Sequence, residues 1–189
     1  MKGQTGKLIY KAGRGNYTNP DAPEKLIRYI TRTNGKAGND LAAWGGLGVT
    51  EFAGVDAVIR QFSIVQETYE RNGEFGRHID HEIFSLSPEA EHAALSNHVD
   101  LDRMAREMAR DIYENDHCQV VYGVHRPDRN DAHTHIHFGI NTVSYRTGRK
   151  RRENKRQTRE REERFGKVVE QEIERSSSGQ SAFLDPGHL

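Results

Sequence analysis

Apolar and polar residues alternate along this chain with two periods, one typical of β-strands and one typical of α-helices. Short apolar or alternating runs predict strands at residues 7–10, 79–86, 119–125 and 133–141. Helical spacing of apolar residues predicts helices that begin near residues 20–23, 55 and 101. The glycine-rich run at 43–48 is expected to form a loop. This order predicts an α+β fold with a central, mainly antiparallel sheet flanked by helices.

The chain changes character after residue 148. Glutamate and arginine interleave from 149 to 175 with few apolar residues, and the serine-rich end has no hydrophobic pattern. Such a segment is typical of an exposed helix or a recruitment tail, followed by disorder at the terminus. We therefore expect a folded domain at residues 1–150 and a charged, helical or disordered C-terminal extension at residues 151–189.

The strand predicted at 133–141 carries histidine at alternate positions. His133, His135 and His137 share one face of such a strand, and the residues between them suit the apolar core. His125 ends the preceding strand, and the turn between the two strands makes a hairpin in which opposite residues share a face. Because imidazole is the commonest neutral ligand of divalent metals, the pattern predicts a metal site. Chance clustering is the alternative, since the chain has ten histidines.

Composition indicates the expected cellular compartment of the protein more clearly than it indicates its activity. Basic and acidic side chains number 28 each, so net charge does not indicate a polyanionic partner. Their distribution is uneven, because residues 146–156 hold seven basic side chains and one acidic side chain. Cys118 is the single cysteine, which excludes an internal disulfide and fits a reducing cytoplasm. No apolar run approaches eighteen residues and no signal-peptide pattern is present, so we expect a soluble, cytoplasmic protein.

The histidine strand resembles a signature of conjugative relaxases. His135-Ile-His137-Phe-Gly-Ile-Asn141 is similar to the H-x-H-x-x-x-N motif of these HUH-superfamily single-strand endonucleases, with His125 as the first histidine of the set. The continuation through Gly148 resembles that of mobilisation-type, MOBP-like relaxases. Leu26-Ile-Arg-Tyr29-Ile-Thr-Arg is similar to the helix that carries the catalytic tyrosine of the family. The resemblance covers roughly residues 5–150 and implies the HUH-endonuclease fold.

The resemblance implies a DNA relaxase that nicks plasmid or integrative-element DNA at a transfer origin. Tyr29 would attack the phosphodiester and form a 5′-phosphotyrosyl intermediate, which conserves the energy of the broken bond. His125, His135 and His137 would hold a divalent metal with positions left open for phosphate, whereas a structural zinc site favours four closed ligands. The resemblance implies magnesium or manganese, the ions usually bound in this family, and zinc also suits imidazole ligands. A core role is the alternative for Tyr29, with Tyr17 and Tyr10 as the reserve nucleophiles.

Some positions depart from the family pattern. The acid that usually follows the first histidine is replaced by Pro127, so we expect Asp128 or Asp131 to supply the carboxylate that orients an imidazole. His133 is an additional histidine that competes for the role of ligand. Asn141 lies on the histidine face, where it either positions the metal cluster or a phosphate, or forms strand hydrogen bonds at the end of the sheet.

Basic and aromatic residues give candidate DNA contacts. The basic run after the metal strand is expected to neutralise DNA phosphates, with a solvated charge run as the alternative. It consists of Arg146, Arg149, Lys150, Arg151 and Arg152. Trp44 is expected either to stack on an unpaired base or to anchor a loop. His78 and His81 are interpreted as surface residues or DNA contacts.

Two other functions remain open from the sequence. The first is a rolling-circle replication initiator or transposase of the HUH type, but those relatives usually place the tyrosine after the histidines, where only Tyr145 occurs. The second is a non-catalytic relaxosome DNA-binding protein that keeps the fold. The expected partners are single-stranded origin-of-transfer DNA, relaxosome accessory proteins and a type IV secretion coupling protein, without membrane insertion.

Overall fold

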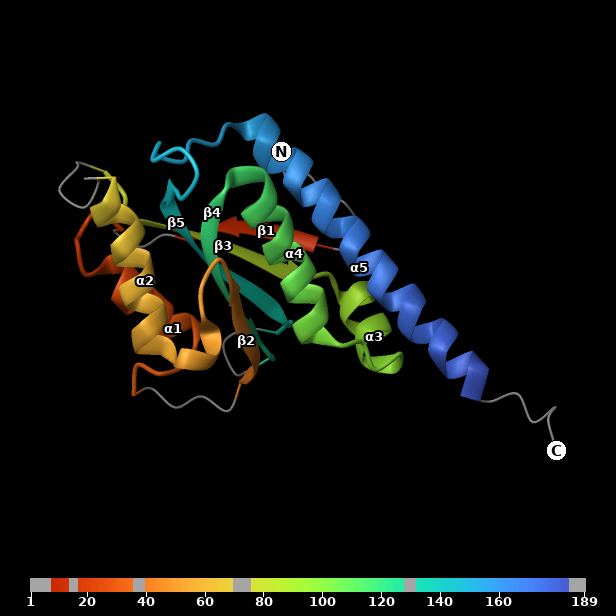
Figure 1. Ribbon diagram of the computed structural model, residues 1–189. Helices are drawn as coiled ribbons and strands as arrows, with labels where there is room; N and C mark the ends of the chain where they lie inside the picture. The colour runs from red at the N-terminus through yellow and green to blue at the C-terminus, as the bar shows by residue number, and fades with distance from the viewer. Residues whose placement is uncertain (1–7, 14–16, 36–39, 70–75, 128–131, 184–189) are drawn as a thin grey trace.

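A five-stranded antiparallel sheet forms the centre of the molecule (Figure 1). The computed structural model describes residues 8–13, 17–35, 40–69, 76–127 and 132–183. The strands are β1 (Leu8–Ala12), β2 (Leu41–Leu47), β3 (Ile79–Leu86), β4 (Cys118–His125) and β5 (His135–Ser144). Their order is β1-β3-β5-β4-β2, and every neighbouring pair is antiparallel. The predicted α+β class with a mainly antiparallel sheet is confirmed.

Helices cover both faces of the sheet. They are α1 (Ala22–Ile30), α2 (Val55–Thr68), α3 (Pro88–Ser96), α4 (Leu101–Asp116) and α5 (Lys155–Phe183), with a short 3₁₀ turn at Glu51–Ala53. One core cluster joins α1 and α2 to a face of the sheet, and a larger one joins α3, α4 and α5 to the opposite face. Because side chains alternate between faces along a strand, the odd-numbered residues of β4 and β5 lie under α1 and α2.

The expected loop at 43–48 is wrong, because Leu41–Leu47 forms the edge strand β2. Its glycines allow close packing. A side chain at Gly45 would lie 2.5 Å from the hydroxyl of Tyr122, and one at Gly46 would lie 2.8 Å from the carbonyl oxygen of Val120. Glycine in a strand can mark such an approach as well as a turn, so the sequence alone does not separate the two.

The C-terminal helix α5 packs against the sheet through buried side chains. Phe165 and Val169 belong to the larger core, and the ring of Phe165 lies 4.7 Å from that of Phe84 and 5.6 Å from that of Phe138. The apolar residues of this helix therefore hold it to the domain, and most of its charged residues are exposed, apart from the buried Arg161 and Glu172. The division near residue 150 stays a prediction, but the segment after it is not an isolated exposed helix.

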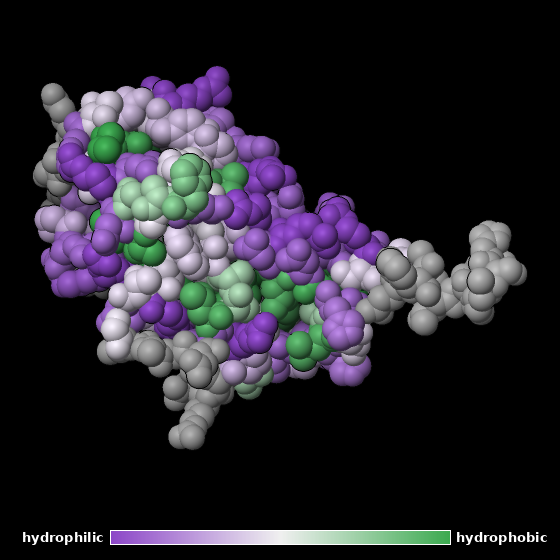
Figure 2. All heavy atoms as spheres, turned by 60° about the horizontal axis from the view of Figure 1, so that its bottom comes forward, coloured by the Kyte–Doolittle hydropathy of each residue, from purple (hydrophilic) through white to green (hydrophobic). Residues whose placement is uncertain are grey.

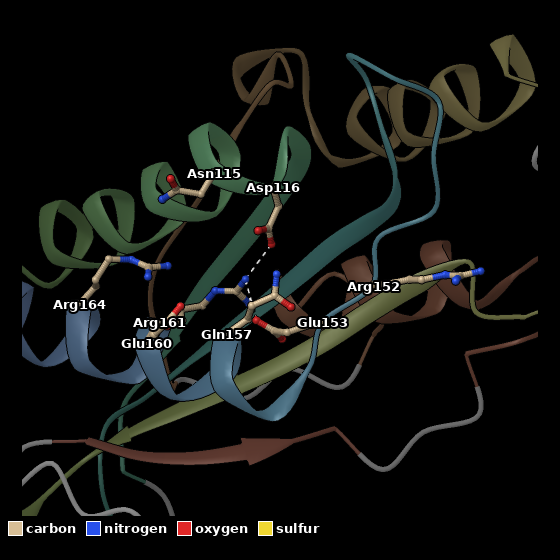
Figure 3. A pocket seen from close by; sticks show the side chains of 8 residues that line it. All are labelled: Asn115, Asp116, Arg152, Glu153, Gln157, Glu160, Arg161 and Arg164. Carbon is tan, nitrogen blue, oxygen red and sulfur yellow. Dashed lines mark hydrogen bonds and ion pairs between the residues drawn. The ribbon is translucent and has the colours of Figure 1, made fainter.

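Buried ion pairs join the start of α5 to the sheet and to the end of α4. Arg161 donates to Glu82 at 2.7 Å and to Asp116 at 2.7 Å, and its side chain is 4% exposed. Figure 3 shows Arg161 pointing to Asp116 and Glu153 in the polar pocket between α4 and α5, whereas Arg152 lies away from them. These pairs neutralise carboxylates that would otherwise be buried without a partner.

The surface carries few large apolar side chains. Among the described residues Phe52, Leu95, Ile64 and Tyr29 are the exposed large hydrophobics. On the face in Figure 2 the hydrophobic areas are small and are separated by hydrophilic ones. No helix within the described ranges has both the length and the apolarity that crossing a membrane requires.

Candidate metal and nuclease site

Three histidines of the β4–β5 hairpin meet under helix α1. His125 pairs directly with His135, and His137 pairs with Gly123, so all three imidazoles share one face as predicted. The ring centroid of His137 lies 4.4 Å from that of His125 and 4.8 Å from that of His135. One ring nitrogen from each residue lies within 4.8 Å of the others, and all three side chains are buried. The geometry therefore gathers one ligand atom from each histidine around a common point.

Hydrogen bonds fix which nitrogen carries the lone pair in the rings of His125 and His135. His125 Nε2 donates to the carbonyl of Ile30 at 2.8 Å, and His135 Nδ1 donates to the carbonyl of His133 at 3.0 Å. The lone pairs then lie on His125 Nδ1 and His135 Nε2. Among described side chains, His125 Nδ1 and His137 Nε2 are buried nitrogens without a hydrogen-bond partner. Buried polar atoms without partners are rare, and a metal ion would satisfy both, so the residues fit such an ion.

Burial keeps the imidazoles of His125 and His137 neutral. It lowers the pKa of His125 to about 4, despite the opposing hydrogen bond to the Ile30 carbonyl. Burial also lowers the pKa of His137 well below its ordinary value, with a further contribution from the neighbouring His125. A neutral imidazole can donate its lone pair to a cation, so both rings are ready to bind at neutral pH.

Tyr29 lies above His125 and His137 at the end of α1. Its ring centroid is 5.3 Å from that of His137 and 6.0 Å from that of His125, with the rings edge to face. Leu26, Ile27 and Ile30 bury the other side of the helix, which leaves Tyr29 36% exposed. The hydrogen bond from His125 to Ile30 ties the end of the helix to the metal strand. Tyr29 is thus not a core residue.

The two reserve tyrosines lie elsewhere. Tyr10 packs on Phe84, with ring centroids 5.1 Å apart, on the sheet face opposite the histidines. Burial raises the pKa of Tyr10 to about 12, so this phenol is poorly ionised. The hydroxyl of Tyr17 lies 2.7 Å from His81 Nδ1, outside the three-histidine cluster. Of the three tyrosines, Tyr29 alone has its ring against His125 and His137.

Arg32 and Asp40 complete the site, and the sequence interpretation assigned no role to either. The guanidinium of Arg32 lies 4.9 Å from the ring centroid of Tyr29, and its Nε donates to Asp40 at 3.0 Å. The hydrogen bond from Arg32 holds the pKa of Asp40 below its usual value. The backbone of Arg32 is left-handed, with φ of 55°, which is uncommon outside glycine. No local pattern pointed to these residues, because Arg32 and Asp40 come together only in the folded chain.

The carboxylates that we expected near the metal, Asp128 and Asp131, lie outside the described residues. Asp40 is the acid recorded beside the cluster, with Oδ2 at 3.9 Å from His125 Nδ1. That separation exceeds a hydrogen bond. His133 offers a backbone carbonyl to His135 and is not part of the three-nitrogen cluster. These positions favour His125, His135 and His137 as the ligand set.

Asn141 shares the histidine face but is fully engaged in hydrogen bonds. Its amide donates to the carbonyl of Phe62 at 3.1 Å and to Gln119 at 2.9 Å. Its oxygen accepts from Gln66 at 3.0 Å and from the backbone nitrogen of Val143 at 3.1 Å. Because the side chain is 0% exposed, these bonds favour a role in tying α2 to the sheet over a contact with phosphate.

The basic run follows the far end of β5, not the metal end. At about 3.3 Å per residue, Ser144 lies roughly 20 Å along the strand from His137, and in Figure 1 the loop after β5 lies at the end of the strand opposite to its start. Arg146, Arg149 and Arg152 are exposed, and Lys150 is half-buried. These four remain candidate phosphate contacts, at a distance from the metal cluster.

Arg151 does not fit the DNA-contact role expected for it. Its side chain is 6% exposed, and it donates to Asp80 at 2.8 Å, to Glu82 at 2.7 Å and to Asp116 at 2.7 Å. A guanidinium that is buried among carboxylates has no free surface for phosphate.

The remaining candidates also have defined places. Trp44 lies half-buried on the edge strand β2, opposite Gly123. His78 is not a surface residue, because it is 5% exposed, whereas His81 is half-buried and its Nε2 lies 2.9 Å from His137 Nδ1. The regular register of β3 against β5 explains this contact, since His81 lies diagonally across from His137.

Comparison with known proteins agrees with the geometry. The family described as "Relaxase: MobA/VirD2-like, nuclease domain" matches residues 29–174. The matched segment begins at Tyr29, includes the three histidines and extends well into α5. No curated protein sequence matches this chain.

Proposed function

Because the chain belongs to the MobA/VirD2-like family of relaxase nuclease domains, we propose that it nicks one DNA strand at a transfer origin. The family implies a DNA-nicking endonuclease, and the proposal adds the nucleophile, the metal and the biological setting. The reaction is a transesterification in preparation for conjugative transfer. The substrate is single-stranded origin DNA of a plasmid or integrative element.

The observation that carries the proposal is the placement of Tyr29 over the histidine cluster. A nucleophile and a cation site on opposite sides of one phosphate can hold the scissile bond in line. The ring of Tyr29 lies 5.3 Å from that of His137, and the residue is 36% exposed, so substrate can reach its side chain. This arrangement supports Tyr29, His125, His135 and His137 as the reacting set.

In the proposed reaction the Tyr29 oxygen bonds to phosphorus while the bond to the 3′ oxygen breaks. The phenolic proton is lost, the 3′ oxygen takes up a proton, and the strand remains attached through a 5′-phosphotyrosyl ester. Arg32 holds its positive charge beside the phenol, where charge develops as the proton leaves. Asp40 fixes the position of Arg32 by accepting its hydrogen bond. The ester conserves the bond energy, so the strand can later be rejoined.

A divalent ion on the three histidines would neutralise charge on the non-bridging phosphate oxygens. Magnesium or manganese is expected there, and zinc also suits the ligands. His125 Nδ1 and His137 Nε2 are buried and have no hydrogen-bond partner among the described residues, so both are available to an ion. The neutral imidazoles leave the full charge of the ion to act on the phosphate.

The basic residues after β5, three of them exposed and one half-buried, suggest a path for the DNA backbone. Arg146, Arg149, Lys150 and Arg152 lie roughly 20 Å from the histidines along β5, so the bound strand would extend over several nucleotides. These contacts would add affinity and salt dependence without sequence preference. The proposed setting is the cytoplasm, with relaxosome accessory proteins and a type IV secretion coupling protein as partners.

The test uses oligonucleotides with a 3′ label that tile the non-coding DNA beside the gene of this protein. A 5′-phosphotyrosyl ester retains the 3′ fragment, so the protein becomes labelled on a denaturing gel when manganese is present and not when EDTA is present. We expect Tyr29→Phe to abolish the labelled adduct while DNA binding stays within about twofold, because one hydroxyl is removed from an exposed ring. A Tyr29→Phe protein that still forms the adduct would exclude Tyr29 as nucleophile.

Tyr145→Phe is the matched control, since Tyr145 follows the histidines as in the rolling-circle initiators. Its ring stacks on Tyr113 with centroids 5.0 Å apart, and burial raises the pKa of Tyr145 to about 12. We expect this variant to nick like the parent protein. Loss of the adduct in Tyr145→Phe would instead support an initiator or transposase. Origin binding without any adduct would support a non-catalytic relaxosome protein.

A further inference from the structure

A chain of hydrogen bonds leads from His137 away from the metal cluster. His137 Nδ1 lies 2.9 Å from His81 Nε2, and His81 Nδ1 lies 2.7 Å from the hydroxyl of Tyr17. The rings of His81 and His137 stack at 25°, with centroids 5.1 Å apart. The sequence comparison assigns no role to His81 or Tyr17.

The direction of these bonds follows from the proposed ligand atom of His137. Binding a cation through Nε2 requires the hydrogen of His137 to be on Nδ1, so this group donates to His81 Nε2. His81 Nε2 then has the lone pair, and its own hydrogen lies on Nδ1. That hydrogen is donated to the oxygen of Tyr17. Each ring in the chain therefore sets the tautomer of the next.

The surrounding backbone holds this chain in place. The amide of His78 donates to the carbonyl of Tyr17 at 2.8 Å, which fixes the Tyr17 segment beside β3. The amide of Gly13 donates to the carbonyl of His81 at 2.9 Å. A side chain at Gly13 would collide with the imidazole of His81, so glycine lets the ring lie against β1. Main-chain contacts from three segments thus position His81 and Tyr17.

We propose that His81 and Tyr17 are positioning residues that hold His137 in the tautomer and ring orientation for binding a divalent cation through Nε2. This inference rests on the proposed metal site and adds residues that do not touch the ion. Partners of this kind typically set metal affinity, because they orient the ligand and make its lone pair more basic.

The experiment measures binding of manganese alone to the metal-free protein by titration calorimetry. We expect His81→Leu to weaken manganese binding roughly tenfold to a hundredfold. His81→Gln keeps an acceptor for His137 and a donor for Tyr17, so its affinity should lie within about threefold of the parent. Tyr17→Phe keeps the ring and removes one acceptor, so we expect a smaller loss, of several-fold. His92→Gln, on the exposed surface of α3, is the control for adventitious histidine binding.

The outcomes separate the inference from the proposed function. A parent protein that binds no manganese would overturn the proposed metal site itself. Equal affinity in the parent, His81→Leu and Tyr17→Phe would overturn only the positioning role. Parent-like binding by Tyr17→Phe alone would remove Tyr17 from the chain. If His81→Leu unfolds, the comparison of His81→Gln with Tyr17→Phe still tests the hydrogen bonds, because both keep a side chain of similar size.

Discussion

Removing the aromatic ring of Phe165 tests whether α5 is an integral part of the domain. Phe165 is 0% exposed and contacts the rings of Phe84 and Phe138 on the face of the sheet that α5 covers. In Phe165→Ala the ring is lost from a core that holds side chains of the sheet, α3 and α4 as well. The change therefore leaves a cavity between α5 and the rest of the protein.

The expected cost follows from the buried area. The loss of about 150 Å² of buried apolar surface lowers the unfolding free energy by about 4 kcal/mol, at roughly 25 cal/mol per Å². This agrees with the usual range of about 3 to 5 kcal/mol for replacing a core phenylalanine by alanine. For a chain of this length, about 4 kcal/mol lowers the melting temperature by about 8 to 16 °C.

The assay is thermal and urea unfolding of the metal-free protein, followed by circular dichroism. Phe52→Ala is the matched control, because Phe52 is 92% exposed and the same atoms are removed. We expect the control to change the unfolding free energy by no more than about 0.5 kcal/mol. If Phe165→Ala unfolds at the same temperature as Phe52→Ala, α5 is an independent extension and our account of its packing is refuted.

Three further predictions follow from buried contacts. Arg151→Met should lower the unfolding free energy by about 3 to 5 kcal/mol, because it leaves buried carboxylates without a partner. Arg152→Met changes an exposed neighbour and should leave the unfolding free energy nearly unchanged in the same urea titration. Gly123→Ala should reduce adduct formation roughly a hundredfold, because the new carbon collides with the carbonyl of Ile30 and displaces the end of α1. Unchanged labelling of the protein by the oligonucleotide would contradict this. Burial raises the pKa of Cys118 to about 12, so the group remains a thiol at pH 8 and should react with a thiol reagent only after unfolding.

Strand periodicity predicted much of the histidine site. Alternating positions on a strand must share a face, and a hairpin brings opposite residues together, so His125, His135 and His137 were expected to meet. The structure pairs His125 with His135 directly. This inference succeeded because it depends only on local geometry and on the connection between two neighbouring strands.

Other features were undecidable from local patterns. The glycines at 45 and 46 fit a loop or a tightly packed strand equally well, and contacts with Tyr122 and Val120 select the strand. Arg151 and Arg152 are adjacent and chemically identical, yet one is buried among carboxylates and the other is exposed. Only the packing of distant elements decides between such alternatives.

The sequence by itself therefore determined the α+β class, most of the elements and the face that carries the three histidines. The tertiary structure decided what surrounds them: the ring of Tyr29 above, Arg32 and Asp40 beside it, and His81 behind His137. The physical reason is the distance along the chain over which each feature is determined. The period of a strand is set by covalent geometry, whereas these contacts join residues from separate segments and depend on how α1 and β3 pack against the hairpin.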